Sequence, residues 1–272
     1  MVASPPQRIT IQTVRAYKQT GKRFAMLTAY DFLTATAFDR AGVPLLLVGD
    51  TLGIFVQGHD TTLPVTMDAM MYHCEIVARA AKQALVVGDL PFGTYHTLEA
   101  GIQNAATLVK STGVQAVKVE GRQDDLIQRL TQLGVPVMGH LGLTPQSVHQ
   151  LGGNKVQART VEAAEQLLQD ALTLERAGIF ALVLEAVPTA VAQEVTAALT
   201  IPTIGIGAGP HCDGQVLVAA DLLGLHDGHS PKFAKRYAHL QPQIATAAEQ
   251  FIEEVDRGLY PSPDHSYDWT LK

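Results

Sequence analysis

The segment Leu45-Leu46-Leu47-Val48-Gly49-Asp50 is a run of apolar residues that ends in a glycine and an acid. A short uninterrupted apolar run is typical of a strand that is covered on both faces. The same three residues occur again at Val87-Gly88-Asp89, although this similarity is too short to indicate a repeat fold. The segment therefore predicts a buried parallel strand with an acid at its end.

Runs of this kind alternate with longer helical stretches along the whole chain. Such alternation predicts parallel strands that are joined by crossover helices. Eight strands in this order favour an α/β fold of the (β/α)8 TIM-barrel class in a single domain. The alternative is an open sheet with an added C-terminal piece. The predicted strands cover residues 24–30, 45–49, 84–88, 116–119, 136–139, 181–184, 202–206 and 215–219.

Threonines stand where several of the intervening helices are expected to begin. The hydroxyl of an N-cap threonine accepts a hydrogen bond from a backbone N–H group that has no partner within the helix. After Thr160 the apolar residues recur on one helical face, and Gly178 follows the last turn, as a left-handed C-cap requires. The predicted N-caps are Thr66, Thr97, Thr160 and Thr189.

The length of 272 residues suits one barrel, because such barrels run to about 250 residues. Residues 10–20 predict a helix that closes the bottom of the barrel, within a barrel domain that covers residues 1–257. Two prolines and several polar residues predict a surface tail over residues 258–272. No shift in composition marks a second domain.

The composition excludes several classes of protein. Apolar residues make up 47% of the chain and charged residues 17%, which excludes a disordered chain. The net charge of −6 argues against nucleic-acid binding and gives no support to binding at an anionic membrane. Cys74 and Cys212 form no Cys-x-x-Cys pair and are expected to be buried free thiols. We expect a cytoplasmic protein, because no signal-peptide or membrane-spanning run is present.

Acidic residues follow the predicted strands at the end where TIM barrels hold their active sites. A single acid at a strand end is more often a helix N-cap or a partner in a surface ion pair. Acids at the ends of four strands favour a metal-binding site instead. Converging carboxylates need a compensating charge, and their oxygens favour Mg²⁺ or Mn²⁺ over zinc. We expect Asp50 and Asp89 as direct ligands, and Glu120 as a third ligand or one that acts through water; Glu185 is the fourth acid.

Lys118 and Glu120 are two residues apart on one predicted strand, so their side chains point to the same face. Lys118 is a candidate to neutralise the acids, to bind a substrate carboxylate or to form a Schiff base, although neighbouring carboxylates keep an amine protonated. His140, at another strand end, is a further candidate for lining the site. Gly205-x-Gly207-x-Gly209 is explained equally well by an anion site and by a tight turn.

Longer motifs follow one another through nearly the whole chain, from about residue 24 to residue 237. They are VGDTLG (48–53), GDLPF (88–92), VKVEG (117–121), GHLGLTPQ (139–146), LEAVP (184–188), IPTIGIGAG (201–209) and PKFAKRY (231–237). Together these motifs are highly specific, and they resemble the ketopantoate hydroxymethyltransferase family of pantothenate biosynthesis.

This resemblance implies a (β/α)8 barrel, one Mg²⁺ per subunit and a homodecamer built as a pentamer of dimers. The family reaction transfers a one-carbon unit from 5,10-methylenetetrahydrofolate to 3-methyl-2-oxobutanoate and gives 2-dehydropantoate. The cofactor is thus Mg²⁺, the folate is a co-substrate, and no nucleic acid or membrane is a partner.

The resemblance also implies roles for individual residues. Asp50, Asp89 and Glu120 resemble the metal ligands, and the first two also lie at the substrate. Thr51 and Lys118 resemble substrate contacts, and Glu185 resembles the proton acceptor. Thr51 departs from the family, in which we expect serine more often; the hydroxyl is kept, and the added methyl group narrows the pocket slightly.

Two other functions remain open at this point. A metal-dependent carbon–carbon lyase or mutase of 2-oxo acids would use the same enolate chemistry without folate. The second alternative is a non-catalytic barrel that binds a small anion through residues 205–209. The acids at the strand ends would repel this anion unless a metal were bound.

Overall fold

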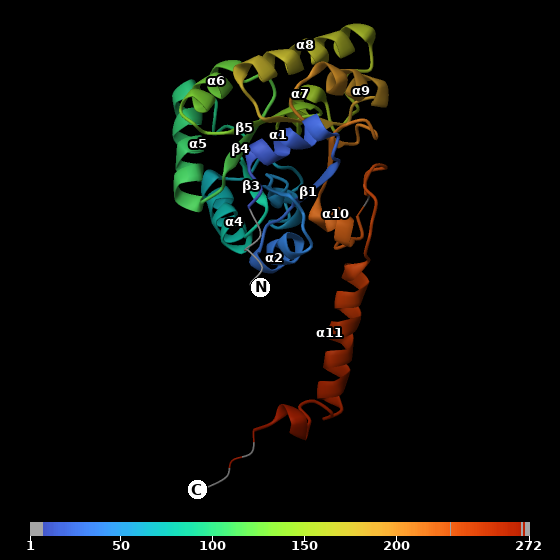
Figure 1. The fold of residues 1–272 in the computed structure, drawn as a ribbon. Coiled ribbons are helices and arrows are strands. Elements are labelled where there is room, and N and C mark those ends of the chain that lie inside the picture. Colours follow the sequence, from blue (N-terminus) through green and yellow to red (C-terminus); the bar gives the residue numbers. More distant parts are fainter. Residues whose placement is uncertain (1–7, 229, 268, 270–272) are drawn as a thin grey trace. The chain divides into compact units, whose positions relative to one another are not determined.

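A computed structural model of the chain describes residues 8–228, 230–267 and 269, and its centre is a closed barrel of eight parallel strands in sequence order (Figure 1). The last strand pairs with the first, which confirms the predicted barrel and excludes the open sheet. The strands are β1 (Phe24–Thr28), β2 (Leu45–Val48), β3 (Leu85–Asp89), β4 (Ala116–Glu120), β5 (Val137–Gly142), β6 (Ala181–Glu185), β7 (Thr203–Ile206) and β8 (Gly214–Leu217).

Helices surround the strands, and within residues 1–219 they pack as neighbours in the order α2, α4, α5, α6, α8 and α9 (Figure 1). Their bounds are α2 (Phe32–Arg40), α4 (Met67–Ala80), α5 (Leu98–Thr112), α6 (Asp124–Gln132), α8 (Val161–Ala177) and α9 (Thr189–Ala198). Shorter helices lie in the connections: α3 (Leu52–Phe55), the 3-10 turn η1 (Pro145–Ser147) and α7 (Val148–Leu151).

The barrel interior is filled by side chains from all eight strands. Helix α1 (Ile11–Thr20) adds Val14 and Tyr17 to this core, where the Tyr17 ring lies 5.4 Å from that of Phe24. The predicted N-terminal helix therefore packs on the interior side chains at the start of the barrel. The inward-facing core residues are Met26, Leu45, Leu47, Leu85, Val87, Ala116, Met138, Phe180, Ala181, Val183, Ile204 and Val216.

Three of the four predicted threonine caps are confirmed. The side chains of Thr66, Thr97 and Thr160 each accept a hydrogen bond from the backbone N–H three residues later. The prediction for Thr189 was wrong, because α9 already includes Thr189 and the residue before it is a proline that has no side-chain acceptor. Instead, Thr189 packs closely against Gly209, at a distance that leaves no room for a Cβ there.

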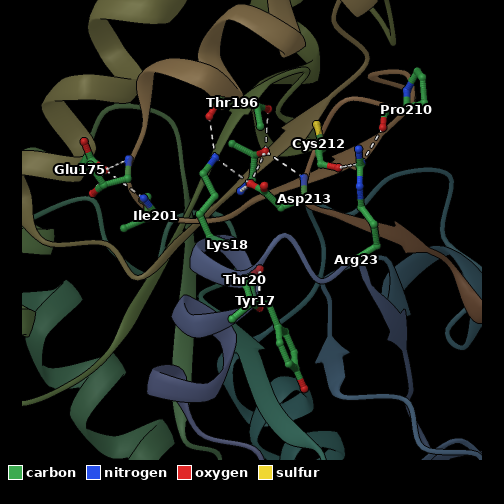
Figure 2. Close-up of polar contacts among 12 residues, drawn as sticks. Tyr17, Lys18, Thr20, Arg23, Glu175, Thr196, Ile201, Pro210, Cys212 and Asp213 are labelled. Carbon is green, nitrogen blue, oxygen red and sulfur yellow. Dashed lines mark hydrogen bonds and ion pairs between the residues drawn. The ribbon is translucent and has the colours of Figure 1, made fainter.

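The connection from β7 to β8, residues 207–213, contains no helix. Gly209 has a φ of +80°, so the glycines of this segment serve a tight turn. The Arg23 guanidinium donates hydrogen bonds to the carbonyl oxygens of Pro210, at 2.7 Å, and of Cys212 (Figure 2). Arg23, directly before β1, therefore holds a connection that contains no helix of its own.

A second clamp on this connection comes from α1 (Figure 2). Lys18 Nζ lies 3.0 Å from Asp213 Oδ2 and donates to the carbonyl oxygen of Thr196 at 2.6 Å. The same Asp213 oxygen accepts the backbone N–H of Thr203 at 2.8 Å. One carboxylate thus joins the N-terminal helix to the beginning of β7.

Residues 220–272 form a compact unit separate from residues 1–219, and α10 (Ala219–Leu223) begins at that boundary. The longest element of this unit is α11 (Leu240–Asp256), which has no buried residue, and a 3-10 turn, η2 (Pro263–His265), follows it. The predicted barrel domain over 1–257 and tail over 258–272 stay predictions; residues 268 and 270–272 lie outside the described part. Among the described residues, no helix has the length and apolar character needed to cross a membrane.

Replacing Asp213 with alanine tests the clamp. Asp213→Ala leaves the Lys18 ammonium and the Thr203 N–H without their partner, and both are partly buried. We expect the free energy of unfolding to fall by about 2 kcal/mol in a urea titration. The control is Glu75→Ala, whose ion pair with Arg79 is 60% exposed and should change stability by less than about 0.5 kcal/mol. Equal stability of the two variants would contradict the clamp.

Candidate active site

A pocket opens at the C-terminal ends of the strands. The structure brings every predicted site residue to its wall, although these residues come from five different strands or the loops after them. They are Asp50, Thr51, Asp89, Lys118, Glu120, His140 and Glu185. The lower wall is apolar and consists of Leu47, Val183, Ile206, Val216 and Val218.

Strand alternation explains why these polar side chains meet. Every second residue of a strand faces the barrel interior, so each inward row of core residues continues upward into the pocket. On β4 this row runs from Ala116 through Lys118 to Glu120, and on β6 it ends in Glu185. The parallel register sets Glu120 beside His140 of β5. The apolar core therefore passes into a polar layer at one end of the barrel.

Three carboxylates and one ammonium form the centre of the pocket, and each of these residues is at most 5% exposed. Lys118 Nζ lies 2.8 Å from Asp89 Oδ1 and 4.0 Å from Glu120 Oε1. The second oxygen of Asp89 accepts the backbone N–H of Asp50 at 3.0 Å. This cluster of Asp50, Asp89, Lys118 and Glu120 is called the acid–lysine cluster below.

Burial and mutual repulsion act on the protonation of this cluster. Burial raises the pKa of Asp50 well above its usual range, and the carboxylates of Asp89 and Glu120 add to the effect. Burial also raises the pKa of Asp89, although Lys118 opposes this. Burial alone would lower the pKa of Lys118, but the surrounding carboxylates outweigh it and raise that pKa. The lysine is therefore a fixed cation, which is unfavourable for a Schiff base.

Gln146, in η1, is a central residue that the sequence analysis did not single out. Its Nε2 donates to Asp50 Oδ2 at 2.8 Å and to the Leu90 carbonyl oxygen at 3.0 Å, while its backbone N–H donates to Glu120 Oε2 at 3.0 Å. The Tyr95 hydroxyl donates to the Gln146 amide oxygen. One neutral residue thereby holds two of the acids, Asp50 through its side-chain amide and Glu120 through its backbone N–H. Its position inside the motif 139–146 was the only signal in the sequence.

His140 lies between two carboxylates. Its Nδ1 is 3.3 Å from Glu120 Oε1 and its Nε2 is 3.3 Å from Glu185 Oε2, as ion pairs rather than well-aligned hydrogen bonds. Burial opposes protonation of the ring, but the two carboxylates outweigh it and raise the pKa of His140 to about 9. His140 therefore carries a positive charge at neutral pH and links the acid–lysine cluster to Glu185.

Glu185 and Thr51 occupy the more open parts of the pocket. The Glu185 side chain is 18% exposed, so it is the most accessible acid of the site. The Thr51 hydroxyl lies 2.6 Å from the hydroxyl of Tyr30, which holds it at the pocket wall. Burial raises the pKa of Tyr30, so its hydroxyl stays protonated.

The side chains of the pocket can be compared with those that a metal ion requires as ligands. Across residues 8–228, 230–267 and 269, no three His, Cys, Asp or Glu side chains stand together in metal-holding geometry. Glu120 is turned to His140 and Gln146 instead. However, Asp89 Oδ1 is buried without an aligned hydrogen bond, and the carboxylates outnumber the ammonium groups around it. Asp50 and Asp89 thus fit a hard cation that keeps several water ligands.

Comparison with solved structures shows the fold. The chain superposes on phosphonopyruvate hydrolase in complex with oxalate and Mg²⁺ with a TM-score of 0.61 and 11% identity, covering 94% of this chain and 92% of that one. It superposes on 2,3-dimethylmalate lyase, a member of the PEP mutase/isocitrate lyase superfamily, with a TM-score of 0.59 and 15% identity, covering 94% and 91%. At these identities, the comparison shows the shared barrel fold alone.

Comparison of sequences shows the family. The chain is 50% identical over 264 residues to the 3-methyl-2-oxobutanoate hydroxymethyltransferase of Heliobacterium modesticaldum, covering 96% of both chains. It is 53% identical over 267 residues to the protein of the same name from Thermobifida fusca, covering 97% and 95%. The family model described as Ketopantoate hydroxymethyltransferase matches residues 8–263. The protein therefore belongs to the ketopantoate hydroxymethyltransferase family of enzymes.

Proposed function

We propose that this enzyme transfers a hydroxymethyl group from 5,10-methylenetetrahydrofolate to 3-methyl-2-oxobutanoate and forms 2-dehydropantoate. The observation that supports this most directly is the division of the pocket, with the acid–lysine cluster on one side and the more exposed Glu185 on the other. A 2-oxo acid held by the cluster would present its C3 hydrogen to Glu185. The names of relatives at about half identity support the same reaction.

We assign Asp50 and Asp89 as ligands of one Mg²⁺ per subunit, with Glu120 acting directly or through water. The carboxylates of the cluster exceed the charge of Lys118, and a divalent cation would balance them. Bound there, Mg²⁺ would supply Lewis-acid stabilisation of negative charge on the keto oxygen. Gln146 would hold the Asp50 carboxylate in place, because its Nε2 donates to Asp50 Oδ2 and is itself fixed by a second hydrogen bond to the Leu90 carbonyl oxygen.

The chain's own residues would bind the 2-oxo acid from both ends. Lys118, a fixed cation, would attract the substrate carboxylate, and the Thr51 hydroxyl, held by Tyr30, would donate to it. Leu47, Val183 and Ile206 would accept the branched apolar end. The substrate would therefore lie with its polar end at the cluster, where Asp50 and Asp89 also border it.

Glu185 would take the proton from C3, a general-base contribution of about 10²–10⁴-fold. His140 Nε2, 3.3 Å from Glu185 Oε2, would orient the carboxylate before the transfer. The electron pair left on the substrate would form the new bond to the methylene carbon of the folate. The two carbon–nitrogen bonds of the methylene carbon would break and water would supply the hydroxyl group. Tetrahydrofolate would leave with the proton taken by Glu185 and one proton from water on its two nitrogens. The predicted homodecamer and cytoplasmic location belong to this proposal, and light scattering would test the assembly.

A turnover assay tests the reaction itself. With 3-methyl-2-oxobutanoate, Mg²⁺ and 5,10-methylenetetrahydrofolate, we expect 2-dehydropantoate to form, and we expect its formation to stop when folate is omitted or a chelator is added. Mass spectrometry of the product provides the readout. Cleavage of 2-oxo acids without folate would favour the lyase alternative and contradict this proposal.

Glu185→Gln tests the base. The amide keeps the shape of the side chain but cannot accept the C3 proton, so we expect the variant to bind the 2-oxo acid with Mg²⁺ yet lose exchange of the C3 hydrogen in deuterated water by about 10²–10⁴-fold, as followed by NMR. Glu165→Gln, an exposed glutamate of α8, is the matched control and should exchange at the normal rate. Full exchange in Glu185→Gln would remove Glu185 as the base.

Asp89→Asn tests the metal assignment. The loss of one ligand charge should raise the dissociation constant for Mg²⁺ roughly 10- to 100-fold in calorimetric titration. Asp68→Asn changes an exposed aspartate of α4 in the same way and should bind Mg²⁺ like the unmodified protein. An unchanged titration of Asp89→Asn would rule out Asp89 as a ligand.

A further inference from the structure

A second pocket, with a volume of about 330 Å³, lies beside the acid–lysine cluster. This volume is at the lower end of the range of about 300–1,000 Å³ that is usual for small-molecule sites. Three loops at the C-terminal ends of β3, β4 and β5 form it, so it opens on the same end of the barrel as the first pocket. The side chains that matter for its chemistry are Phe92, Tyr95, His96, Gln123, Gln146 and Ser147.

The two pockets share a wall. Glu120 lines both of them. Gln146, which lines the second pocket, donates to Asp50 in the first and accepts from the Tyr95 hydroxyl in the second. Two molecules that occupy the two pockets would therefore lie next to each other. Transfer of a carbon unit between two substrates requires such adjacency.

The loop that carries the aromatic residues is held by its own hydrogen bonds. The backbone N–H and the hydroxyl of Thr94 both donate to the Pro91 carbonyl oxygen, at 3.1 and 2.7 Å, and Asn104 of α5 donates to the Thr94 carbonyl oxygen at 2.6 Å. On this fixed loop the Phe92 side chain is 53% exposed. A large apolar ring kept in solvent at a pocket edge is suited to stack on a flat ligand.

The polar groups of the pocket suit a neutral heterocycle. The side chains of Gln123 and Ser147 make no hydrogen bond within the described part of the chain, so an amide and a hydroxyl remain available to a ligand. Apart from the buried Glu120, no carboxylate or ammonium lines the space. A planar ring with amide-like donors and acceptors on its edge matches this set better than a phosphate or a charged peptide would.

We propose that this second pocket binds the pterin ring of the folate donor, stacked on Phe92 and hydrogen-bonded by Gln123 and Ser147. This inference rests on the proposed function, which requires a folate but leaves its site open. The pterin ring would then lie beside the first pocket, next to the wall that Glu120 and Gln146 form.

The test measures binding of tetrahydrofolate by calorimetry under anaerobic conditions. Phe92→Ala removes the stacking surface and should raise the dissociation constant about tenfold. Gln123→Ala should raise it several-fold through the lost hydrogen bond. In both variants the dissociation constant for 3-methyl-2-oxobutanoate should stay within about twofold. Leu133→Ala, at the other end of α6 and equally exposed at 52%, is the control and should bind tetrahydrofolate normally.

The outcomes separate this proposal from the proposed function. If the unmodified enzyme forms 2-dehydropantoate only with folate, and both pocket variants still bind tetrahydrofolate with the original affinity, the pocket assignment is overturned while the reaction stands. Equal weakening of both ligands would also overturn it, because that result indicates a general distortion. If the unmodified enzyme neither binds tetrahydrofolate nor uses a folate donor, the proposed function fails first and this inference fails with it.

Discussion

The structure depends on one constraint, the burial of three carboxylates around a single ammonium group. Asp50, Asp89 and Glu120 are nearly free of solvent contact, and Lys118 is their one buried lysine partner. An ionised carboxylate without compensation is costly in such a place. The surrounding chain offers hydrogen-bond donors to the remaining oxygens, from Gln146 and from the backbone of Asp50. What this leaves is a surplus of negative charge, and that surplus is the physical reason to expect a cation.

The same constraint organises the rest of the pocket. Because the cluster occupies the side formed by β2, β3 and β4, the opposite side at β6 is left for the more accessible Glu185. His140 stands between the two sides and carries charge that offsets both neighbouring carboxylates. Barrels of the same shape with low identity, such as 2,3-dimethylmalate lyase, share the frame. The reaction is set by the side chains at the strand ends and by the loops above them, so fold similarity alone would not separate a transferase from a lyase.

The sequence predicted the barrel and the candidate site residues well, because both depend on strand periodicity. Buried parallel strands are continuous apolar runs, and each observed strand overlaps its predicted range. Asp89, Glu120 and Glu185 proved to be the last residues of their strands rather than the first residues of loops. Features set by loops escaped prediction. Gln146 reaches Asp50 only through the path of η1, the β7–β8 connection lacks a helix, and Thr189 packs on Gly209 instead of capping α9.

The most direct measurement of the central claim is a crystal structure of the enzyme with Mn²⁺ in place of Mg²⁺, located by its anomalous scattering. We expect one peak in the pocket, at about 2.0–2.2 Å from carboxylate oxygens of Asp50 and Asp89, with Glu120 bound directly or through a water molecule. A pocket that stays free of metal at millimolar Mn²⁺, or a peak that avoids both aspartates, would show that the acid–lysine cluster is not the metal site.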